Sequence, residues 1–312
     1  MFGASRRDCS TGYSAAWIRD NVYEAMGLET SSVHKAIKVY QKLLDILRKH
    51  EYKIDWAIRE KPKHAYQYIH ARYNPDTLEE IYEDWGNKQN DAVGLLLFKI
   101  GELERKGVKV LRDADDKRIV QKLVHYLASI EYWQDPDNGI WEEREELHAS
   151  SIGACIAGLE QIKFIVDVPV ELIIKGREAL NSLLPRESET KSVDLALLSL
   201  IYPFNIANEE QREQILKNIE EQLVRNRGLI RYHGDLYYNA KGEAEWTFGF
   251  PWLATIYKKL NKPNKHAFYM MKTLEAMNYK GELPELYYAN SNLYNDNCPL
   301  GWAQAMHLVA LQ

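Results

Sequence analysis

This sequence has few features of secreted, membrane-bound or zinc-stabilised proteins. The three cysteines, Cys9, Cys155 and Cys298, are far apart and show no CxxC spacing, so we interpret them as buried thiols rather than as disulfide or zinc partners. No run approaches the roughly 20 apolar residues of a membrane span, and the N-terminal MFGASRRDCS lacks the apolar core of a signal peptide. We therefore expect a soluble cytoplasmic protein without a membrane partner.

A surplus of positive charge is also missing. The 40 Lys and Arg residues are scattered among 45 Asp and Glu residues, which gives a net charge of −5 and a pI near 6.0. Without a basic stripe, nucleic acid is excluded as the main partner. The 46% hydrophobic content of the 312 residues is enough for a substantial core, and no linker, low-complexity tract or internal repeat divides it. We predict a single domain over residues 1–312.

Phenylalanine is rare relative to the other aromatic residues, with 7 Phe against 20 Tyr and 8 Trp. Tyr and Trp combine a flat apolar face with a hydrogen-bonding edge, which suits the CH face and the hydroxyl groups of a sugar ring. Composition alone equally allows these residues to be half-buried side chains that pack helices together. A carbohydrate ligand is therefore one of two interpretations at this point.

The pattern of apolar residues predicts an almost entirely α-helical chain, because these residues recur at 3.6-residue spacing and hardly ever alternate at period two. Ser31 or Ser32, Pro169 and Asn208 mark helix starts, and Gly107 marks an end. The predicted helices cover residues 18–28, 32–50, 89–106, 115–133, 149–164, 169–183, 191–201, 208–225, 249–260, 264–277 and 299–311. Long polar connections remain at 52–88, 134–148, 226–248 and 278–298. Alternating short and long connections favour a ring of helical hairpins over an up-down bundle.

Five clusters of charged, amide and aromatic residues lie at or beside these connections. Each could be an ordinary helix start or a charge on a helix macrodipole, but loops gathered at one mouth of such a ring often carry function. The clusters are AAWIRDN at 15–21, WGNKQND at 85–91, NGIWEER at 138–144, GLIRYHGD at 228–235 and LPELYY at 283–288. His148 and His233 lie near them and are interpreted as hydrogen-bonding neighbours rather than catalysts.

Taken together, the clusters fit the hydrolysis of a glycosidic bond. That reaction needs two carboxyl groups on opposite sides of an anomeric carbon, within a polar and aromatic-lined cup. Glu142 follows Ile140 and Trp141, and apolar neighbours raise the pKa of a carboxyl group, so Glu142 is the candidate general acid. Glu285 lies in an irregular segment and is the candidate base that activates water.

At these residues the sequence resembles glycoside hydrolase family 15, the glucoamylases and their relatives, and the related region of the phosphorylase kinase α and β subunits. WIRD resembles the W-x-R-D sugar-binding motif of the family, WGNKQND its W-G-x-x-Q-x-D segment and GIWEER its W-E acid motif. IRYHGDLYY with a following PW resembles its arginine segment, and ELPELYY with a following PLGW resembles its base motif. The resemblance implies an (α/α)6 barrel, in agreement with the helix pattern.

The resemblance also implies roles for individual residues. Glu142 would be the general acid and Glu285 the general base of a single displacement with inversion, while Arg19 and Asp20 would hydrogen-bond the terminal glucose. The remaining substrate-binding positions implied by the motifs are Trp17 beside that glucose, Trp85 over the acid, Arg231 at the cleavage point, and Gln89, Asp91, Trp141, Glu143, Asp235 and Tyr287. Room for the attacking water needs a carboxyl separation of roughly 6.5–9.5 Å, and the reaction requires no metal or organic cofactor.

The sequence departs from the family pattern at its start. Only 16 residues precede Trp17, so the first barrel helix could be missing, and the β-sandwich that precedes the barrel in many prokaryotic members is absent. Leu286 follows the base where the family often has glutamine or phenylalanine. These departures bear on catalytic competence more than on the fold.

Three interpretations of the function are left, and we prefer the first. It is an exo-acting α-glucosidase that releases β-glucose from maltooligosaccharides, with α-1,6-glucans and trehalose left open as substrates. The second is a non-catalytic module that binds an oligosaccharide or a protein, as in phosphorylase kinase. The third, a helical repeat protein, predicts internal repeats, and none is found. The segment 61–66 could wall the mouth of the site or be a solvated surface loop. The sequence does not indicate the oligomeric state.

Overall fold

Helices make up most of the computed structural model, which describes residues 1–9, 11–83 and 85–312. In α2, the residues Ala36, Val39, Tyr40, Leu43 and Leu47 recur at helical spacing and are all buried, so this helix presents one apolar stripe to the core. The α-helices of the described residues are α1 Ile18–Glu29, α2 Val33–Lys49, α3 Glu51–Arg59, α4 Asn90–Arg105, α5 Ala114–Ile130, α6 Ala149–Ile162, α7 Val170–Leu183, α8 Glu209–Gln222, α9 Gly249–Lys259, α10 Pro263–Glu275 and α11 Gly301–Leu311. Two 3₁₀ helices are η1 Ala65–Gln67 and η2 Leu195–Leu200.

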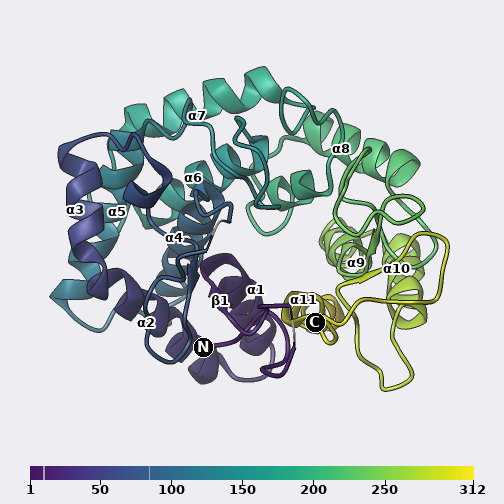
Figure 1. Ribbon diagram of the computed structural model, residues 1–312. Coiled ribbons are helices and arrows are strands. Elements are labelled where there is room, and N and C mark those ends of the chain that lie inside the picture. Colours follow the sequence, from purple (N-terminus) through teal and green to yellow (C-terminus); the bar gives the residue numbers. More distant parts are fainter. Residues whose placement is uncertain (10, 84) are drawn as a thin grey trace.

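Six of these elements close into an inner ring (Figure 1). The ring consists of α1, α4, α6, η2, α9 and α11 in this order, and α11 packs back against α1. Glycines allow the close contact between α4 and α6. A Cβ on Gly94 would lie 2.4 Å from the carbonyl carbon of Ala154, and one on Gly158 would lie 2.5 Å from the Gly94 oxygen. The two helices therefore pack backbone against backbone, which glycine permits and larger residues do not.

A second layer of helices covers the outside of the ring. Helix α2 packs on α1, α7 on α6, α8 on η2 and α10 on α9, while α5 packs on α2 and α3. Outer helices bury one side only: α8 buries Ile215, Leu216 and Ile219, and an Asn208–Gln211 capping box fixes its start. Apart from the consecutive outer helices α2 and α3, inner and outer elements alternate along the described chain, as in the predicted (α/α)6 barrel.

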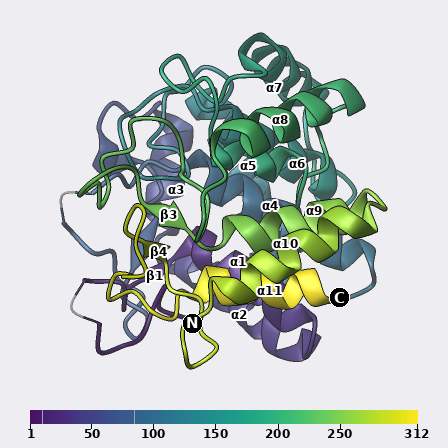
Figure 2. The same cartoon turned by 90° about the vertical axis from the view of Figure 1, so that its right-hand side faces the viewer.

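Two short antiparallel ribbons tie the connections together at one end of the ring. Strand β1 Ala16–Trp17 pairs with β2 Arg72–Tyr73, and β3 Glu245–Trp246 pairs with β4 Leu286–Tyr287. Figure 2 shows β1, β3, β4 and the long connections gathered on the left, away from the C-terminal end of α11. Because the ribbons link segments far apart in sequence, they fix the positions of the five sequence clusters relative to one another.

The structure differs from the predicted helices in two places. Residues 191–201 were predicted as an α-helix, but the segment forms the 3₁₀ helix η2 over six residues, which Asp194 caps by accepting a hydrogen bond from the Ala196 N–H. The whole of LALLSL is buried, so its apolar pattern has no face and cannot distinguish the two helix types. Helix α3 lies within the segment 52–88 that was predicted as a connection. It follows α2 after a break at His50, where the predicted helix 32–50 correctly ends, but the helix beyond that break was not predicted.

Two further sequence predictions concern the cysteines and the membrane. All three cysteines are free thiols, but only Cys155 is buried, while Cys9 and Cys298 are partly exposed. The prediction of buried thiols is therefore wrong for two of the three. Among the described helices, none combines the length and the apolar character needed to cross a lipid bilayer.

Candidate active site

A cavity of about 690 Å³ lies at the end of the ring where the long connections gather. The N-terminal ends of α1 and α11 and the connections before α4, α6, α9 and α11 all contribute to its wall. Nine of the thirteen predicted site residues line it: Trp17, Arg19, Asp20, Trp85, Trp141, Glu142, Glu143, Arg231 and Glu285. Clusters separated by up to about 270 residues in sequence thus meet at one place, as the sequence analysis predicted.

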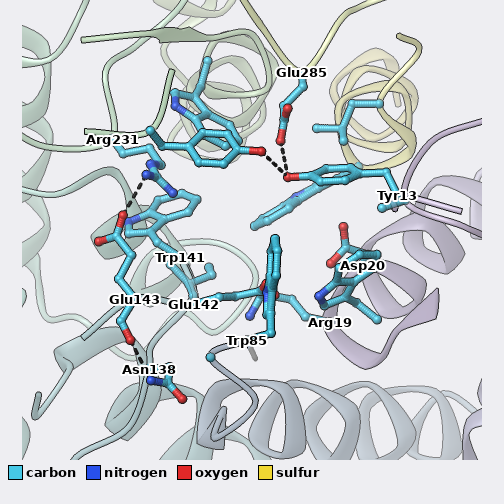
Figure 3. A pocket seen from close by; sticks show the side chains of 18 of the residues that line it. Tyr13, Arg19, Asp20, Trp85, Asn138, Trp141, Glu142, Glu143, Arg231 and Glu285 are labelled. Carbon is cyan, nitrogen blue, oxygen red and sulfur yellow. Dashed lines mark hydrogen bonds and ion pairs between the residues drawn. The ribbon is translucent and has the colours of Figure 1, made fainter. Parts of the chain in front are cut away.

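Glu142 sits in a tight turn between α5 and α6. Its backbone φ is +63° and that of Gly139 is also +63°, and such a left-handed conformation is uncommon for a glutamate. A Cβ on Gly86 would lie 2.4 Å from the Glu142 carbonyl oxygen, so the neighbouring connection presses directly on the turn. The backbone conformation aims the side chain into the cavity (Figure 3).

The carboxylate of Glu142 is held by an arginine and a tryptophan. Arg19 donates from Nη2 to Oε1 at 2.7 Å, and the Trp85 indole N–H donates to Oε2. Arg19 itself is fixed from behind, because its Nη1 donates to Gln89 at 2.8 Å and to Asp91 at 3.2 Å. The surroundings of the Glu142 carboxylate are therefore charged and polar. The prediction of an apolar environment, made from its neighbours in sequence, was wrong.

Glu285 enters the cavity from the connection between α10 and α11 and is held by neutral donors. The Tyr13 hydroxyl donates to Oε1 at 2.7 Å, Asn297 Nδ2 donates to Oε2 at 2.8 Å, and Asn295 donates to the same oxygen. Only 1% of Glu285 is exposed. Burial raises the pKa of Glu285, and the three hydrogen bonds oppose that rise.

The two glutamates face the cavity from different sides of the ring (Figure 3). Glu142 comes from the connection that precedes α6, and Glu285 from the one that precedes α11. No hydrogen bond joins these two described carboxyl groups, and the cavity lies between their loops. A sugar in this cavity can therefore meet one carboxyl group on each face, which is the arrangement that glycoside hydrolysis requires.

Asp20 places a third carboxyl group in the cavity. Its side chain receives no hydrogen bond from any described side chain, and it lies beside Arg19 at the start of α1. Burial raises the pKa of Asp20 to about 7, although the charge of Arg19 acts in the opposite direction. A buried carboxyl group that no described side chain bonds can accept from a ligand that brings its own hydroxyl groups.

On the opposite wall, Arg231 is clamped between carboxylates and rings. It donates from Nε and Nη2 to Asp235 at 2.7 and 2.6 Å, and from Nη2 to Glu143 at 2.7 Å. Its guanidinium also lies 4.8 Å from the centre of the Trp246 ring. Burial alone would raise the pKa of Glu143, but the charges of Arg231 and Lys191 outweigh it and lower that pKa. Both side chains are thus fixed in their charged forms.

Tryptophans supply most of the apolar lining. Trp141 donates from its indole N–H to Asp194 at 2.8 Å, which fixes its ring against the wall. The indole N–H groups of Trp17, Trp246 and Trp302 are buried and have no partner among the described residues. These three donors lie within the wall of the cavity, and buried donors of this kind are costly to leave unpaired.

A buried histidine lies directly beneath the turn that carries Glu142. A Cβ on Gly139 would lie 2.8 Å from the His148 ring, and His148 Nδ1 lies 3.3 Å from Glu187. Burial would lower the pKa of His148, but the carboxylates of Glu187 and Asp137 outweigh it and raise the pKa to about 9. His148 is therefore a structural cation under the site, as its interpretation as a hydrogen-bonding neighbour implied.

Four predicted binding residues do not line the cavity. Gln89 and Asp91 hold Arg19, and Asp235 holds Arg231, so these three position other residues. The Tyr287 hydroxyl donates to the Ala276 carbonyl at 3.0 Å, which turns it away from the cavity. We correct the predicted role of all four from ligand contact to support.

Sequence reasoning missed a further set of residues around the two glutamates. They are Tyr13, Tyr237, Asn138, Trp246 and Trp302 in the cavity wall, and Asn295 and Asn297 behind Glu285. Trp246 and Trp302 had a usable signal, because each is a rare residue next to a recognised cluster. The contact of Tyr13 with Glu285 spans 272 residues, and nothing local in the sequence indicates it.

Known proteins are similar to this chain over most of its length. The model of the glycosyl hydrolases family 15 matches residues 1–305. The probable phosphorylase b kinase regulatory subunit alpha of Caenorhabditis elegans is 27% identical over 87% of this chain and 27% of its own length. The rabbit (Oryctolagus cuniculus) skeletal muscle isoform of that subunit is 25% identical over 94% of this chain and 30% of its own length. The chain thus spans less than a third of these relatives.

Solved structures with the same fold include glycosidases. A wild-type glycosidase superposes with a TM-score of 0.84 at 19% identity, covering 99% of this chain and 90% of the other. A bacterial glucoamylase complexed with acarbose gives a TM-score of 0.70 at 15% identity, covering 96% and 49% of the two chains. At these identities the likeness establishes the (α/α)6 toroid. With the family model matching nearly the whole chain, the protein belongs to glycosyl hydrolase family 15.

Proposed function

We propose that this protein is an inverting, exo-acting α-glucosidase that releases β-glucose from the non-reducing ends of maltooligosaccharides or related α-glucans. The observation that carries the proposal is the pair Glu142 and Glu285, which enter one cavity from different sides of the ring with different partners. The tryptophan rings of the wall and the carboxyl group of Asp20, which no described side chain bonds, support a sugar ligand.

In the proposed reaction Glu142 gives its proton to the glycosidic oxygen as the bond from that oxygen to the anomeric carbon breaks. A water molecule attacks the opposite face of that carbon, and Glu285 takes the proton that the water loses. The raised pKa of Glu285 makes it a stronger base than an exposed carboxylate. A sugar hydroxyl that accepts from Arg19 would compete with the Arg19–Glu142 ion pair.

Binding of the sugar would use both walls. Arg19 and Asp20 lie together at the start of α1 and offer a donor and an acceptor to adjacent hydroxyl groups. Arg231, held rigid by Asp235, lies across the cavity beside Trp141. The cavity volume of about 690 Å³ falls in the usual range for small-ligand sites. A site that opens at one end of a helical ring favours attack on chain ends.

The test is to incubate the purified protein with maltose, maltotriose, isomaltose and trehalose at mildly acidic pH and to follow the anomeric protons by NMR. Early appearance of β-glucose, lost in both Glu142→Gln and Glu285→Gln, is the expected result, and it also identifies the preferred linkage. Glu178→Gln is the matched control, because Glu178 is exposed on the outer helix α7. Early α-glucose would contradict inversion.

A second candidate is a non-catalytic module that binds an oligosaccharide or a protein. It is favoured by the similarity to regulatory subunits of phosphorylase b kinase. If none of the sugars is cleaved, while maltooligosaccharides still raise the melting temperature of the wild-type protein, this second function replaces the first. Loss of that stabilisation in Arg231→Ala would place the binding in the same cavity.

A further inference from the structure

Aromatic side chains gather outside the cavity, on the segment that joins α3 to β2. The group, which we call the rim platform, consists of Trp56 in α3, Tyr66 in η1 and His64, which directly precedes η1. The Trp56 and Tyr66 rings lie 6.1 Å apart, and the His64 ring stacks on Tyr66 at 5.5 Å and 8°. Trp56 is 39% exposed and Tyr66 60% exposed, although aromatic rings of this size are usually buried.

The rim platform is continuous with the cavity. Ala65, between His64 and Tyr66, is itself part of the cavity wall. A ligand that extends out of the cavity past Ala65 would therefore reach the platform without leaving the protein surface. Sequence analysis left open whether the segment 61–66 walls the mouth or is a solvated loop, and the contact of Ala65 favours the first.

The segment is held rigidly in place. Gln67 is buried and accepts hydrogen bonds from the backbone N–H groups of Lys63 and His64 at 2.8 and 2.9 Å. The Tyr68 hydroxyl donates to Asp135 at 3.1 Å, and Lys61 pairs with Glu131 at 2.7 Å. These contacts join the segment to the connection that carries Glu142. A surface whose rings are already ordered loses little conformational entropy when it binds a ligand.

The chemistry of the platform fits a sugar chain better than a protein. Its members are rings with polar edges, and the flanking Glu60, Lys61 and Lys63 are charged and exposed, so no broad aliphatic patch surrounds them. Protein interfaces need a larger contiguous apolar area. Flat rings with hydrogen-bonding edges instead suit the CH faces and hydroxyl groups of successive glucose units.

We propose that the rim platform binds the part of an α-glucan chain that protrudes from the cavity, so that the protein prefers long chains to disaccharides. This inference rests on the proposed function, because it takes the chain end to lie in the cavity. Tyr66 and Trp56 are binding residues in this proposal and take no part in bond cleavage. Their removal should therefore weaken the use of long chains and leave maltose unaffected.

The test compares kcat/KM for maltoheptaose and maltose in the wild type, Tyr66→Ala, Trp56→Ala and the double variant. The ratio of the two values should fall about threefold to tenfold per ring removed, the range for one aromatic contact, while kcat/KM for maltose is unchanged. Tyr66→Trp should restore the ratio. Tyr279→Ala is the matched control, since Tyr279 is 87% exposed in another connection. An unchanged ratio with normal maltose hydrolysis overturns the platform and leaves the proposed function intact.

A measurement without catalysis separates the two proposals. Migration of each variant through native gels that contain glycogen reports binding even if the wild type cleaves no sugar. Retardation of the wild type that is lost in the double variant supports the platform. No retardation of the wild type by glycogen overturns it. A wild-type dimer that the double variant converts to a monomer, with equal retardation of both, would show that the surface contacts a second copy, and this outcome also overturns the proposal.

Discussion

Glu142 and Glu285 line the same cavity, but the protein holds their carboxyl groups in different ways. Glu142 pairs with the guanidinium of Arg19 and stands on a left-handed turn, whereas Glu285 is buried among the neutral donors of Tyr13, Asn295 and Asn297. A direct cationic partner and a set of neutral donors affect a carboxyl group differently. Two residues of one type thus stand in different surroundings within one cavity.

The largest expected effect separates these roles by the leaving group of the substrate. Glu142→Gln and Glu285→Gln should each reduce kcat for maltose by about 10²–10⁴-fold, the usual contribution of a general acid or base. With α-glucosyl fluoride, whose leaving group needs no proton, Glu142→Gln should recover most of its activity and Glu285→Gln should recover none. Fluoride release measured with a selective electrode gives the rates. Recovery in Glu285→Gln instead would reverse the assignment of acid and base.

The second effect concerns the stability of the two carboxyl environments. Arg19→Leu leaves Asp91 and Glu142 without their cation, and breaking a buried ion pair costs about 3–5 kcal/mol. Asn297→Ala removes one of the neutral donors to Glu285 and should cost about 1–3 kcal/mol. Unfolding in urea, followed by circular dichroism, measures both free energies. Equal losses would mean that the two environments do not differ in the way described.

A third, smaller effect is on the pH dependence of activity. Glu285 must be ionised to accept a proton, so activity is lost as the pH falls through its pKa. Asn297→Ala and Tyr13→Phe each remove a hydrogen bond that favours the ionised form, so the acidic limb of kcat/KM should move to higher pH. The rate at pH 5 relative to pH 7 should drop about tenfold for loss of one charge-assisted hydrogen bond. Asn278→Ala, which removes an amide in the same connection that bonds Glu282 rather than Glu285, should leave the limb in place.

The smallest effect is on the pH dependence of stability through Asp20. Burial raises its pKa from the ordinary 3.8 to about 7 in the folded protein, so the folded form keeps a proton that the unfolded chain loses between these values. The contribution of Asp20 to stability is therefore full below about pH 4 and falls as the pH rises to 7. Asp20→Asn should raise the melting temperature by about 2–5 °C at pH 8 and by little at pH 4. Scanning calorimetry at both values checks the sign.

The fold could be predicted from sequence where helices have faces. The stripe of α2 and the capping box of α8 are local signals, and both gave the right element. The buried run LALLSL has no polar face, so its 3₁₀ geometry was not predictable from periodicity. Helix α3 was missed because it is only nine residues long and buries just Lys53, Ile54 and Ala57, which is too short a stripe to show a helical period.

Site residues could be predicted where they lie in short sequence motifs. They could not be predicted where their role depends on contacts between segments far apart in the chain. WIRD and GIWEER indicated Arg19 and Glu142 through their resemblance to motifs of the family. Tyr13 acquires its partner only because the N-terminal segment passes beside the connection before α11, and Asn295 only because its loop folds back on Glu285. The environment of Glu142 was mispredicted for the same reason, since Arg19 and Trp85 reach it from 123 and 57 residues away.

The fixed guanidinium of Arg231 bears on how the cavity tells one sugar from another, because Asp235 and Glu143 hold it in one orientation in the cavity wall. A deoxy sugar of the same outline would fill the space and leave this donor with one partner fewer, and a site that loses a hydrogen bond in this way discriminates far more strongly than one that merely gains or loses a methyl group. Selectivity would then come from the cost of binding the wrong sugar. A series of deoxyglucose derivatives would show which hydroxyl group meets Arg231.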